Sequence, residues 1–288
     1  MRRHLLILLL GALLFGCATD TQRSKSQNPG EPFAESQKLH RILDAYFEEY
    51  LKLAPLFATS IGDHRYNDRL AIFIGEESRG RRRALYQRYQ TETTKLQKDR
   101  LKTDDRLILA VFERTLTRNL EALQFDQHLQ PVRQLNSLAV DFPVIGSGNE
   151  LQPFNTVADY NNFLKRIDQF QIWADTAIGN MQKGIALGVV QPTVVMQRTL
   201  PQLKAMIVGA PEESLFFRPI LQMPPDFSES EKARLTKAYS QAIDQKIIPT
   251  YRKLHNFIQQ EYLPHTRTTY GISSLPNGAA WYEYLVRT

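Results

Sequence analysis

The chain has 288 residues, of which 42% are hydrophobic and 23% are charged, and its formal net charge is +6 at pH 7. A chain of this length and composition can bury one large core or two modest ones. Its single cysteine excludes an internal disulfide.

The N-terminus has the pattern of a bacterial lipoprotein signal. Arg2 and Arg3 precede an apolar run, residues 5–15, that is too short to span a bilayer comfortably as a permanent helix. The segment Leu14-Phe15-Gly16-Cys17 has the Leu-x-Gly-Cys form of a lipobox, in which the thiol carries a diacylglycerol. The pattern predicts a signal peptide over residues 1–16 and a lipid on Cys17 that anchors the mature chain to a membrane.

A simple secretory signal with an incidental cysteine is the alternative. An unmodified thiol would be a liability in an exported protein, which favours lipidation. Ala18 follows the cysteine at the position where an aspartate would favour retention at the inner membrane. The lipobox therefore predicts an outer-membrane anchor in the bacterial cell envelope, with the protein facing the periplasm.

The positive charge is concentrated in one segment. Loss of residues 1–16 removes two arginines and no acidic residue, so the formal charge falls from +6 to +4. Much of the remaining excess lies in Arg79, the run Arg81-Arg82-Arg83 and Arg88. Such a run is typical of a solvated helix face, and contact with an anionic membrane or envelope polymer is the alternative. Nucleic acid is not an expected partner, because no recognition motif is present.

Most of the chain has a helical pattern. Residues 17–36 are polar with prolines and a glycine, which predicts a flexible tether before a helical domain over residues 37–288. From Gln37 to Pro55, apolar residues recur every three or four positions and predict an amphipathic helix. Further helices are predicted from Glu76 to Lys98 and from about Thr103 to Gln127.

Prolines and glycines interrupt every apolar cluster between residues 131 and 153, which predicts a long ordered loop. Asn155 or Thr156 is then expected to cap a helix that ends at Gly184 or Gly188.

Two more helical segments follow. Pro192 is expected to open a helix that runs to about Val208 and is disturbed at Pro201. Ser228 and Glu231 form a capping-box pattern before a long segment to Tyr262, with a bend predicted at Pro249.

The C-terminus has a strand-like pattern. A turn is predicted at residues 275–278, and Tyr282, Tyr284 and Val286 alternate after it. The predicted fold is therefore mainly α, an irregular helical bundle with long loops containing proline and glycine and one short β-hairpin or strand at the C-terminus.

Common catalytic motifs are missing from the sequence. None of the six histidines begins a His-Glu-x-x-His motif and no two lie four apart, so no metal site is predicted, although folding could bring His255 and His265 together. Ser147 stands between glycines without the Gly-x-Ser-x-Gly spacing of a nucleophile elbow. There is no Walker loop and no dinucleotide fingerprint.

A polar cluster follows the first predicted helix, at residues 58–70. It includes Asp63, His64, Tyr66 and Asp68, with few apolar residues between them. The first interpretation is an Asx-type turn in which Asp63 and Asn67 satisfy backbone amides and Arg69 pairs with Asp68. The alternative is part of a ligand cleft.

These residues carry a family resemblance. The segment "YLKLAPLFATSIGDHRYNDRL" resembles the opening signature of the bacterial family catalogued as Domain of Unknown Function 885, with Pro-x-x-Ala-Thr-x-x-Gly followed by Tyr-x-Asp-x-Leu. Further matches in the same order are "FNTVADYNNFLKRI", "GIALGVVQPTVVMQRTLPQL", "IIPTYRKLHNFIQQEYLPHTR" and "GISSLPNGAAWYEYLVRT". The resemblance covers nearly all of residues 37–288.

The resemblance implies half of a larger protein. Members are generally about twice this length, often exported, and similar to gluzincin-type zinc peptidases, with a His-Glu-x-x-x-Gly-His-type motif in their second half. No position of this chain matches that motif, so no zinc ligand or catalytic base can be carried over. The resemblance implies a chain that holds no cofactor and is not catalytic alone, with zinc expected only in the missing half. By resemblance alone, Tyr282 and Tyr284 are candidates to hold peptide substrate, although structural packing is the simpler role.

Three hypotheses follow for the function. The first is a lipoprotein that corresponds to the non-catalytic N-terminal half of the family domain, which binds peptide or needs a separately encoded C-terminal half. The second is a structural or interaction lipoprotein of the envelope that uses the basic segment around Arg79. The third is an autonomous enzyme with an unrecognised set of catalytic residues.

Overall fold

The computed structural model describes residues 31–288, and these residues are mainly α-helical, as the sequence predicts. Within this range the β-type pairing is limited to an isolated bridge between Pro192 and Arg267. The helices are α1 (Glu31–Leu53), α2 (Pro55–Ser60), α3 (Glu76–Thr94), α4 (Thr103–Ala122), α5 (Leu138–Gly146), α6 (Val157–Leu187), α7 (Thr193–Lys204), α8 (Arg218–Leu221), α9 (Glu229–Ala242), α10 (Ile248–Phe257) and α11 (Gly278–Arg287).

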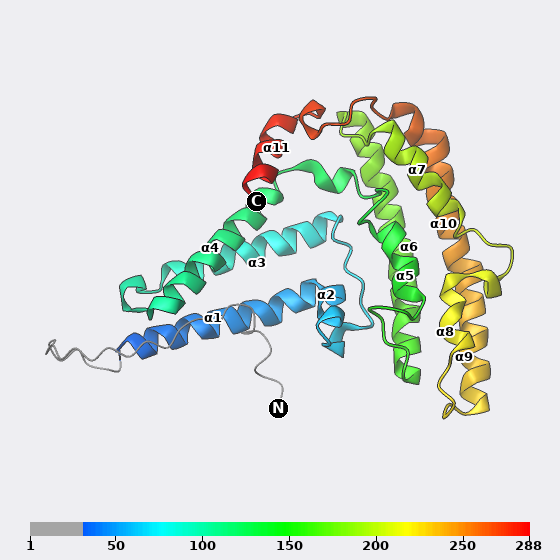
Figure 1. Ribbon diagram of the computed structural model, residues 1–288, viewed down its shortest axis with the longest axis horizontal. Coiled ribbons are helices and arrows are strands. Elements are labelled where there is room, and N and C mark those ends of the chain that lie inside the picture. The colour runs from blue at the N-terminus through cyan, green and yellow to red at the C-terminus, as the bar shows by residue number, and fades with distance from the viewer. Residues whose placement is uncertain (1–30) are drawn as a thin grey trace, which may run out of the picture.

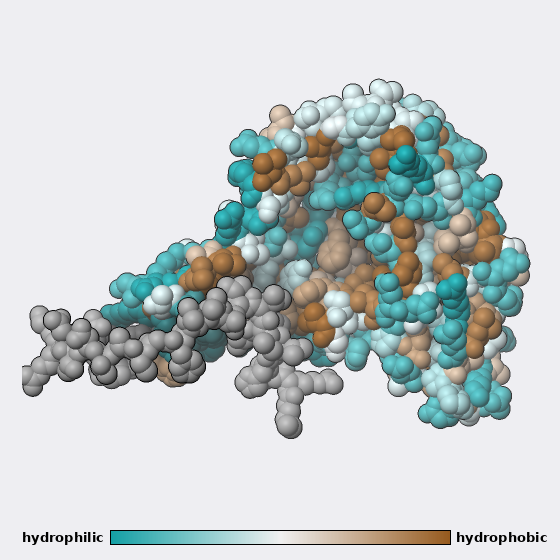
Figure 2. Space-filling view, viewed as in Figure 1, coloured by the Kyte–Doolittle hydropathy of each residue, from teal (hydrophilic) through white to brown (hydrophobic). Residues whose placement is uncertain are grey.

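The helices form two lobes that meet at an angle (Figure 1). The first lobe contains α1 to α4, and the second contains α5 to α10. Helix α11 returns from the second lobe to the end of α4, so that the C-terminus lies beside the first lobe. Figure 2 shows that the molecular surface is hollowed beneath α11, between the two lobes.

The first lobe is held by apolar contacts among its three long helices. Its main cluster brings α3 and α4 together and packs against Ile42, Leu43 and Tyr46 of α1. The buried members of this cluster are Leu85, Tyr86, Tyr89, Phe112, Leu116 and Leu123. Helix α1 supplies only partly buried residues to this cluster. It therefore covers one side of the α3–α4 pair.

Helix α1 begins at Glu31, earlier than the predicted start at Gln37, so the predicted tether 17–36 is wrong for residues 31–36. Two buried polar side chains explain the extension. Glu35 accepts a hydrogen bond from the Gln97 backbone at 2.9 Å, and Ser36 accepts one from the Lys102 backbone at 3.2 Å. These bonds tie the first turns of the helix to the connection between α3 and α4. The predicted lipidation site Cys17 and signal peptide 1–16 lie outside the described residues.

The second lobe contains the largest core, organised around α6. The aromatic residues Phe163, Phe170 and Trp173 of this helix are buried at helical spacing. The start of α6 confirms the predicted cap, because the Thr156 side chain accepts from the Asp159 backbone in a capping box. Its end is confirmed as well, since Gly188 adopts a left-handed conformation with φ of 69°.

The predicted loop over residues 131–153 is wrong in its central part, where α5 forms despite Pro143. Proline has no N–H to donate to the carbonyl four residues earlier, which belongs to Ala139. That carbonyl instead accepts a hydrogen bond from the Tyr251 hydroxyl at 3.0 Å. Gly146 ends the helix against Phe163 and Phe216, whose ring atoms would lie 2.5–2.6 Å from an added Cβ. Tertiary contacts therefore stabilise a helix that the local sequence does not favour.

The predicted capping box at Ser228 and Glu231 is confirmed at the start of α9. From there to Tyr262 the chain stays helical but widens twice into π-helical turns, at Ile243–Ile247 and Ile258–Tyr262. The first of these turns precedes Pro249, which lies in the first turn of α10. There the Ile248 N–H donates to the Ile243 carbonyl, five residues back. The extra residue in the turn thus coincides with the proline at which a bend was predicted.

The predicted C-terminal strand is wrong, because residues 278–287 form α11. Asn277 has a left-handed φ of 55°, and the helix starts at the next residue. An added Cβ on Gly278 would lie 2.1 Å from the Ile272 carbonyl oxygen, so only glycine fits there. Trp281 is buried against Phe125, and Tyr284, three residues further, contacts the same ring. The three-residue spacing of these contacts is helical and overrides the alternating pattern.

The helices α3, α4 and α7 end at Thr94, Ala122 and Lys204, before the predicted ends at Lys98, Gln127 and Val208. Short 3₁₀ turns at residues 98–100 and 126–129 follow the first two. Pro201 lies inside the last turn of α7, and the helix ends three residues after it.

Candidate functional site

The family signature segment, residues 50–70, contains the end of α1, helix α2 and the 3₁₀ turn that follows it. Asp63 precedes a 3₁₀ turn and accepts a hydrogen bond from the Arg65 backbone at 3.1 Å. The Arg65 guanidinium also binds Asp63 at 2.6 Å and Glu48 at 2.8 Å. These hydrogen bonds from Arg65 lower the pKa of the Asp63 carboxyl. For Asp63, the turn interpretation is therefore correct.

The other candidate residues of this segment differ in exposure. Tyr66 is buried and packs with Leu51 and Ala58. Asp68 lies at the surface, 3.8 Å from Arg69 and 3.4 Å from Lys165. A ligand could reach Asp68 without rearrangement of the segment, whereas the ring of Tyr66 belongs to the core.

The hydroxyl, amide and imidazole groups of the segment form a connected chain. The Thr59 hydroxyl lies 2.8 Å from Asn67 Oδ1, and Asn67 Nδ2 lies 3.1 Å from His64 Nδ1. Asn67 thus bonds to two side chains rather than to the backbone amides that the turn interpretation assigned to it. Thr59 and Asn67 are both buried.

This chain of polar groups ends on Arg166 of α6, whose side chain is fully buried. Arg166 Nη2 donates to the Thr59 hydroxyl at 2.7 Å, Nη1 donates to Gln152 Oε1, and Nε donates to the Arg69 carbonyl at 2.9 Å. The Tyr66 carbonyl accepts a further bond at 3.3 Å. Burial lowers the pKa of Arg166 to about 10. We define these groups as the Arg166 cradle, which joins the signature segment to the second lobe.

The tyrosines at the C-terminus lie elsewhere. Tyr284 stacks obliquely on Phe125 at 5.2 Å between ring centroids, and its hydroxyl donates to the Arg118 carbonyl at 3.3 Å. Tyr282 is 56% exposed. No hydrogen bond or ring contact in the described structure joins either tyrosine to Asp63, so the two predicted parts of a cleft are not brought together directly. Their roles toward a ligand stay predictions.

Residues 31–288 contain neither a candidate metal site nor a helix suited to span a membrane. No group of three or more histidine, cysteine, aspartate or glutamate side chains in this range is arranged to hold a metal ion. In the same range, no helix has the length and apolar character needed to cross a membrane.

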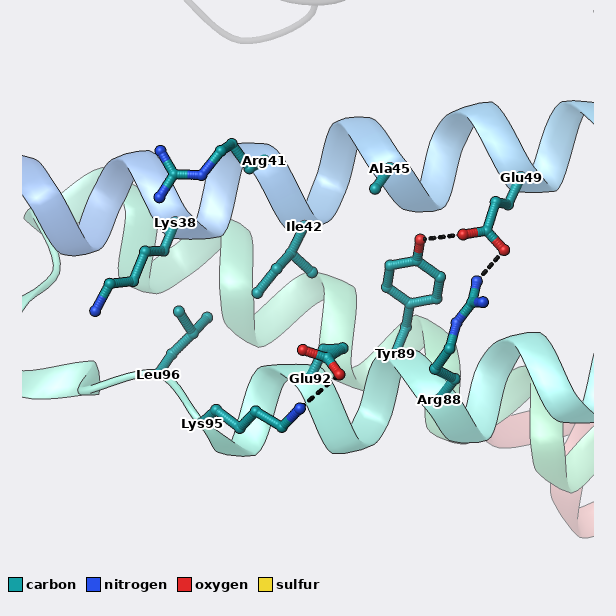
Figure 3. Close-up of a pocket in the computed structure, with 10 residues that line it drawn as sticks. All are labelled: Lys38, Arg41, Ile42, Ala45, Glu49, Arg88, Tyr89, Glu92, Lys95 and Leu96. Carbon is teal, nitrogen blue, oxygen red and sulfur yellow. Dashed lines mark hydrogen bonds and ion pairs between the residues drawn. The ribbon is translucent and has the colours of Figure 1, made fainter.

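A surface groove lies between α1 and α3, with a volume of about 560 Å³ (Figure 3). Ile42 and Ala45 of α1 and Leu96, just after α3, give it an apolar floor. Charged side chains from both helices stand along its edges. The lining residues are Lys38, Arg41, Ile42, Ala45, Glu49, Arg88, Tyr89, Glu92, Lys95 and Leu96.

Most of the charges along the groove are paired across or along its edges. Glu49 of α1 accepts from Arg88 and, at 2.9 Å, from the Tyr89 hydroxyl, both of α3. The bond from Arg88 lowers the pKa of Glu49, and burial raises the pKa of Tyr89 to about 12. Arg41 forms no hydrogen bond or ion pair with any described residue, which leaves one cation of the groove available.

The sequence pointed to neither Arg166 nor the groove. One signal for Arg166 was available, because it stands at helical spacing between Phe163 and Phe170 on the buried face of α6. A charged residue at such a position needs polar partners from elsewhere in the fold. The sequence contains no comparable signal for the groove, because the groove depends on the separation at which α1 and α3 pack.

The fold defines a mainly α-helical, two-lobed protein in which the signature segment anchors one lobe to the other. Residues 55–288 match the model of the family described as "Bacterial protein of unknown function (DUF885)". The chain belongs to this family.

One solved structure of similar fold is described as "The crystal structure of the putative lipoprotein from Colwellia psychrerythraea". The two chains are 18% identical, the TM-score is 0.74, and the match covers 88% of this chain and 46% of the other. This chain therefore spans about half the length of that relative. No curated protein matches the chain.

Proposed function

We propose that this chain is a lipid-anchored protein of the bacterial cell envelope whose helical body binds peptides without hydrolysing them. The lipobox at Cys17 and the description of the Colwellia relative as a lipoprotein support the anchor. Ala18 after the cysteine supports an outer-membrane location facing the periplasm. The resemblance to peptidase-like proteins supports peptide as the ligand.

The groove between α1 and α3 carries the peptide-binding proposal. Its lining on α1 extends from Lys38 to Glu49, which corresponds to about 16 Å at a rise of 1.5 Å per residue. An extended peptide of about five residues has this length. The apolar floor suits one or two aliphatic side chains, and Arg41 suits an acidic one.

The ion pairs along the edges favour a preformed site. The contacts from Arg88 and Tyr89 to Glu49 hold α1 and α3 at a fixed separation. A ligand that enters a preformed groove loses less free energy to ordering of the protein. The groove thus resembles a rigid recognition surface more than a catalytic centre.

Peptide binding at the groove is tested by fluorescence anisotropy with two labelled peptides, acetyl-Leu-Ala-Glu-Leu-Ala amide and the same peptide with lysine in place of glutamate. We expect saturable binding of the glutamate peptide and weaker binding of the lysine peptide. Ala45→Trp fills the groove and should weaken binding at least tenfold. Ala84→Trp, on an exposed part of α3 outside the groove, is the matched control. No saturable binding, or equal losses in both variants, would contradict the proposal.

The absence of hydrolysis rests on the sequence. Zinc peptidases of the gluzincin type need two helical histidines, a third ligand and an acidic general base to activate water. No position of this chain matches their His-Glu-x-x-x-Gly-His-type motif. We therefore expect the purified chain, supplied with stoichiometric zinc, to leave peptide substrates intact. Zinc-dependent cleavage by the pure chain would overturn this part of the proposal.

Exposed apolar side chains favour a second candidate function, association with a separately encoded C-terminal half. Leu107 and Val111 of α4 are 64% and 58% exposed, and Tyr282 and Val286 of α11 are 56% and 68% exposed. Exposed apolar groups of this kind mark interaction surfaces when they gather into patches. Translation of the DNA directly downstream tests the idea. A reading frame with family-like sequence and a His-Glu-x-x-x-Gly-His motif would support it, and unrelated sequence would favour a standalone binding protein.

A further inference from the structure

The basic segment of α3 divides into outward and inward arginines. Arg81 has a 64% exposed side chain and pairs with Glu77 at 2.5 Å, as expected for a solvated helix face. Arg79 is only 8% exposed, and Arg82, one helical turn further, is partly buried. Residues three apart share a face of a helix. The predicted solvated basic face is therefore wrong for Arg79 and Arg82, which point toward the interior.

These two arginines line a pocket of about 400 Å³ where the two lobes meet. Arg133, in the segment before α5, contributes a third guanidinium from the side of the second lobe, since the neighbouring Val132 is buried in the core of that lobe. The walls include the apolar side chains of Trp173 and Leu138. We call this site the arginine pocket; none of its lining residues belongs to the groove between α1 and α3.

The guanidinium groups of the arginine pocket are held by neutral acceptors. Arg79 donates to the Leu123 carbonyl at 2.9 Å, and Arg82 donates to the Phe73 carbonyl at 2.8 Å. Arg133 donates to the Gln130 carbonyl at 3.4 Å. None of the three forms an ion pair with a carboxylate in the described part of the chain.

Two buried donors of the pocket have no hydrogen-bond partner within residues 31–288. They are the Nε atoms of Arg79 and Arg82, and the Nδ1 atom of His128 is also without a partner. The Arg82 guanidinium lies 5.0 Å from the centre of the Phe73 ring, within the range of a cation–π contact. A buried polar group without a hydrogen bond costs stability unless a ligand or water satisfies it.

Burial disfavours the charged forms of the basic groups in the pocket. It lowers the pKa of Arg79, Arg82 and Arg133, and it also lowers the pKa of His128. The carboxylates of Glu76 and Asp126 act on Arg79 from exposed positions and do not pair with it. Three guanidinium groups line the same pocket, and none of them pairs with a carboxylate among residues 31–288, so the pocket attracts an anion.

We propose that the arginine pocket binds the carboxylate of a small organic acid that also carries an apolar group. A guanidinium offers paired donors that match a carboxylate, and three such groups come from two lobes. Trp173 and Leu138 would cover the apolar part of the ligand. The volume suits a molecule of about the size of an amino acid or dipeptide derivative. The inference does not depend on peptide binding at the groove, because the two sites share no residue.

Isothermal titration calorimetry at low ionic strength tests the proposal on the full folded chain. The probes are acetate, N-acetylphenylalanine, the amide of N-acetylphenylalanine, and inorganic phosphate. We expect N-acetylphenylalanine to bind more tightly than acetate, and its uncharged amide to show no binding. Phosphate is expected to bind less tightly than N-acetylphenylalanine, because it leaves the apolar walls uncovered.

Variants locate the binding site. Arg82→Met and Arg133→Met each keep a long apolar side chain and should weaken N-acetylphenylalanine binding about 10- to 100-fold, the effect of a lost charged hydrogen bond. Arg81→Met removes the same charge from the exposed side of α3 and should change binding less than twofold. If Arg82→Met lacks the circular dichroism of the folded chain, Arg133→Met from the other lobe decides the question.

Three results would overturn the proposal. The first is no binding of either carboxylate by the wild-type chain. The second is phosphate binding without carboxylate binding, which would reassign the pocket to another oxyanion. The third is an equal loss of affinity in Arg81→Met and Arg82→Met, which would indicate diffuse attraction to the basic surface.

Discussion

The two buried arginine clusters of this protein differ in how their donors are satisfied. Arg166 is fully buried, and all of its guanidinium nitrogens donate to acceptors of the signature segment or to Gln152. In the arginine pocket, Arg79 and Arg82 leave donors without partners among the described residues. Both clusters place positive charge between the lobes. Only the Arg166 cradle is complete without a ligand.

The difference separates a structural role from a binding role. A buried charge whose nitrogens all have acceptors fixes the groups around it, and its removal leaves several acceptors unsatisfied. A buried charge with open donors is a cost that a ligand can offset. We therefore expect the Arg166 cradle to hold the lobes together. The unpaired donors of the arginine pocket should instead lower the stability of the protein without ligand.

The largest expected effect is the loss of the cradle. Arg166→Met leaves the Thr59 hydroxyl, the Gln152 side chain and two backbone carbonyls without their donor, so it should lower the free energy of unfolding by about 3 kcal/mol or more. Urea denaturation followed by circular dichroism measures the change. Arg198→Met on an exposed part of α7 is the matched control, with an expected change below about 0.5 kcal/mol. A decrease in unfolding free energy of less than about 1 kcal/mol in Arg166→Met would contradict a structural role for Arg166.

A smaller effect is expected for the signature threonine. Thr59→Val keeps the shape of the side chain but removes the hydroxyl that Arg166 and Asn67 contact at 2.7 and 2.8 Å. The unfolding free energy should fall by about 1–3 kcal/mol, the cost of unsatisfied buried polar groups. In the Arg166→Met background the same substitution should cost much less, because the two residues share one network. Additive effects in this double-mutant cycle would argue against the cradle.

The arginine pocket should respond weakly to the same kind of change. Arg82→Met removes a partly buried charge that has no ionic partner in the described structure, and loses one bond to the Phe73 carbonyl. The two effects oppose each other, so the unfolding free energy should change by less than about 1 kcal/mol in either direction. A loss as large as that of Arg166→Met would mean that both clusters are structural and that the comparison fails.

The smallest effect concerns Asp63, whose ionic contacts lie near the surface. Hydrogen bonds from Arg65 lower its pKa below the ordinary value of 3.8, so the carboxylate stabilises the fold above that pH and loses this contribution as the pH falls through the lowered value. Asp63→Asn should reduce the unfolding free energy at pH 7 by less than about 1 kcal/mol and make stability less dependent on pH below about 4. Urea denaturation at pH 3 and pH 7 provides the measurement. An unchanged pH dependence would contradict the assignment.

Local patterns predicted the helical class and several caps, because caps depend on a few neighbouring residues. The capping boxes at Thr156 and Ser228 are confirmed for this reason. Local patterns gave wrong predictions where contacts between residues far apart in the sequence determine the structure. Helix α5 tolerates Pro143 because Tyr251 satisfies a freed carbonyl, and α11 forms because Trp281 and Tyr284 find Phe125.

The same limit applies to the sites. The signature segment was visible in the sequence, but the sequence did not show that its polar groups would surround Arg166, which lies about a hundred residues away along the chain. The run from Arg79 to Arg83 was visible as well. Which of its members line the arginine pocket with Trp173 and Arg133 depends on how the two lobes pack together.

The most direct test of the central claim is ligand-induced stabilisation, measured as the shift in thermal unfolding midpoint with N-acetylphenylalanine at about 100 times its dissociation constant. For wild type and Arg81→Met we expect a rise of about 5–10 °C, from the linkage of binding to folding. Arg82→Met at the same ligand concentration should show a clearly smaller rise. No rise in the wild type, or the same rise in all three proteins, would contradict the claim that the arginine pocket is built for a ligand.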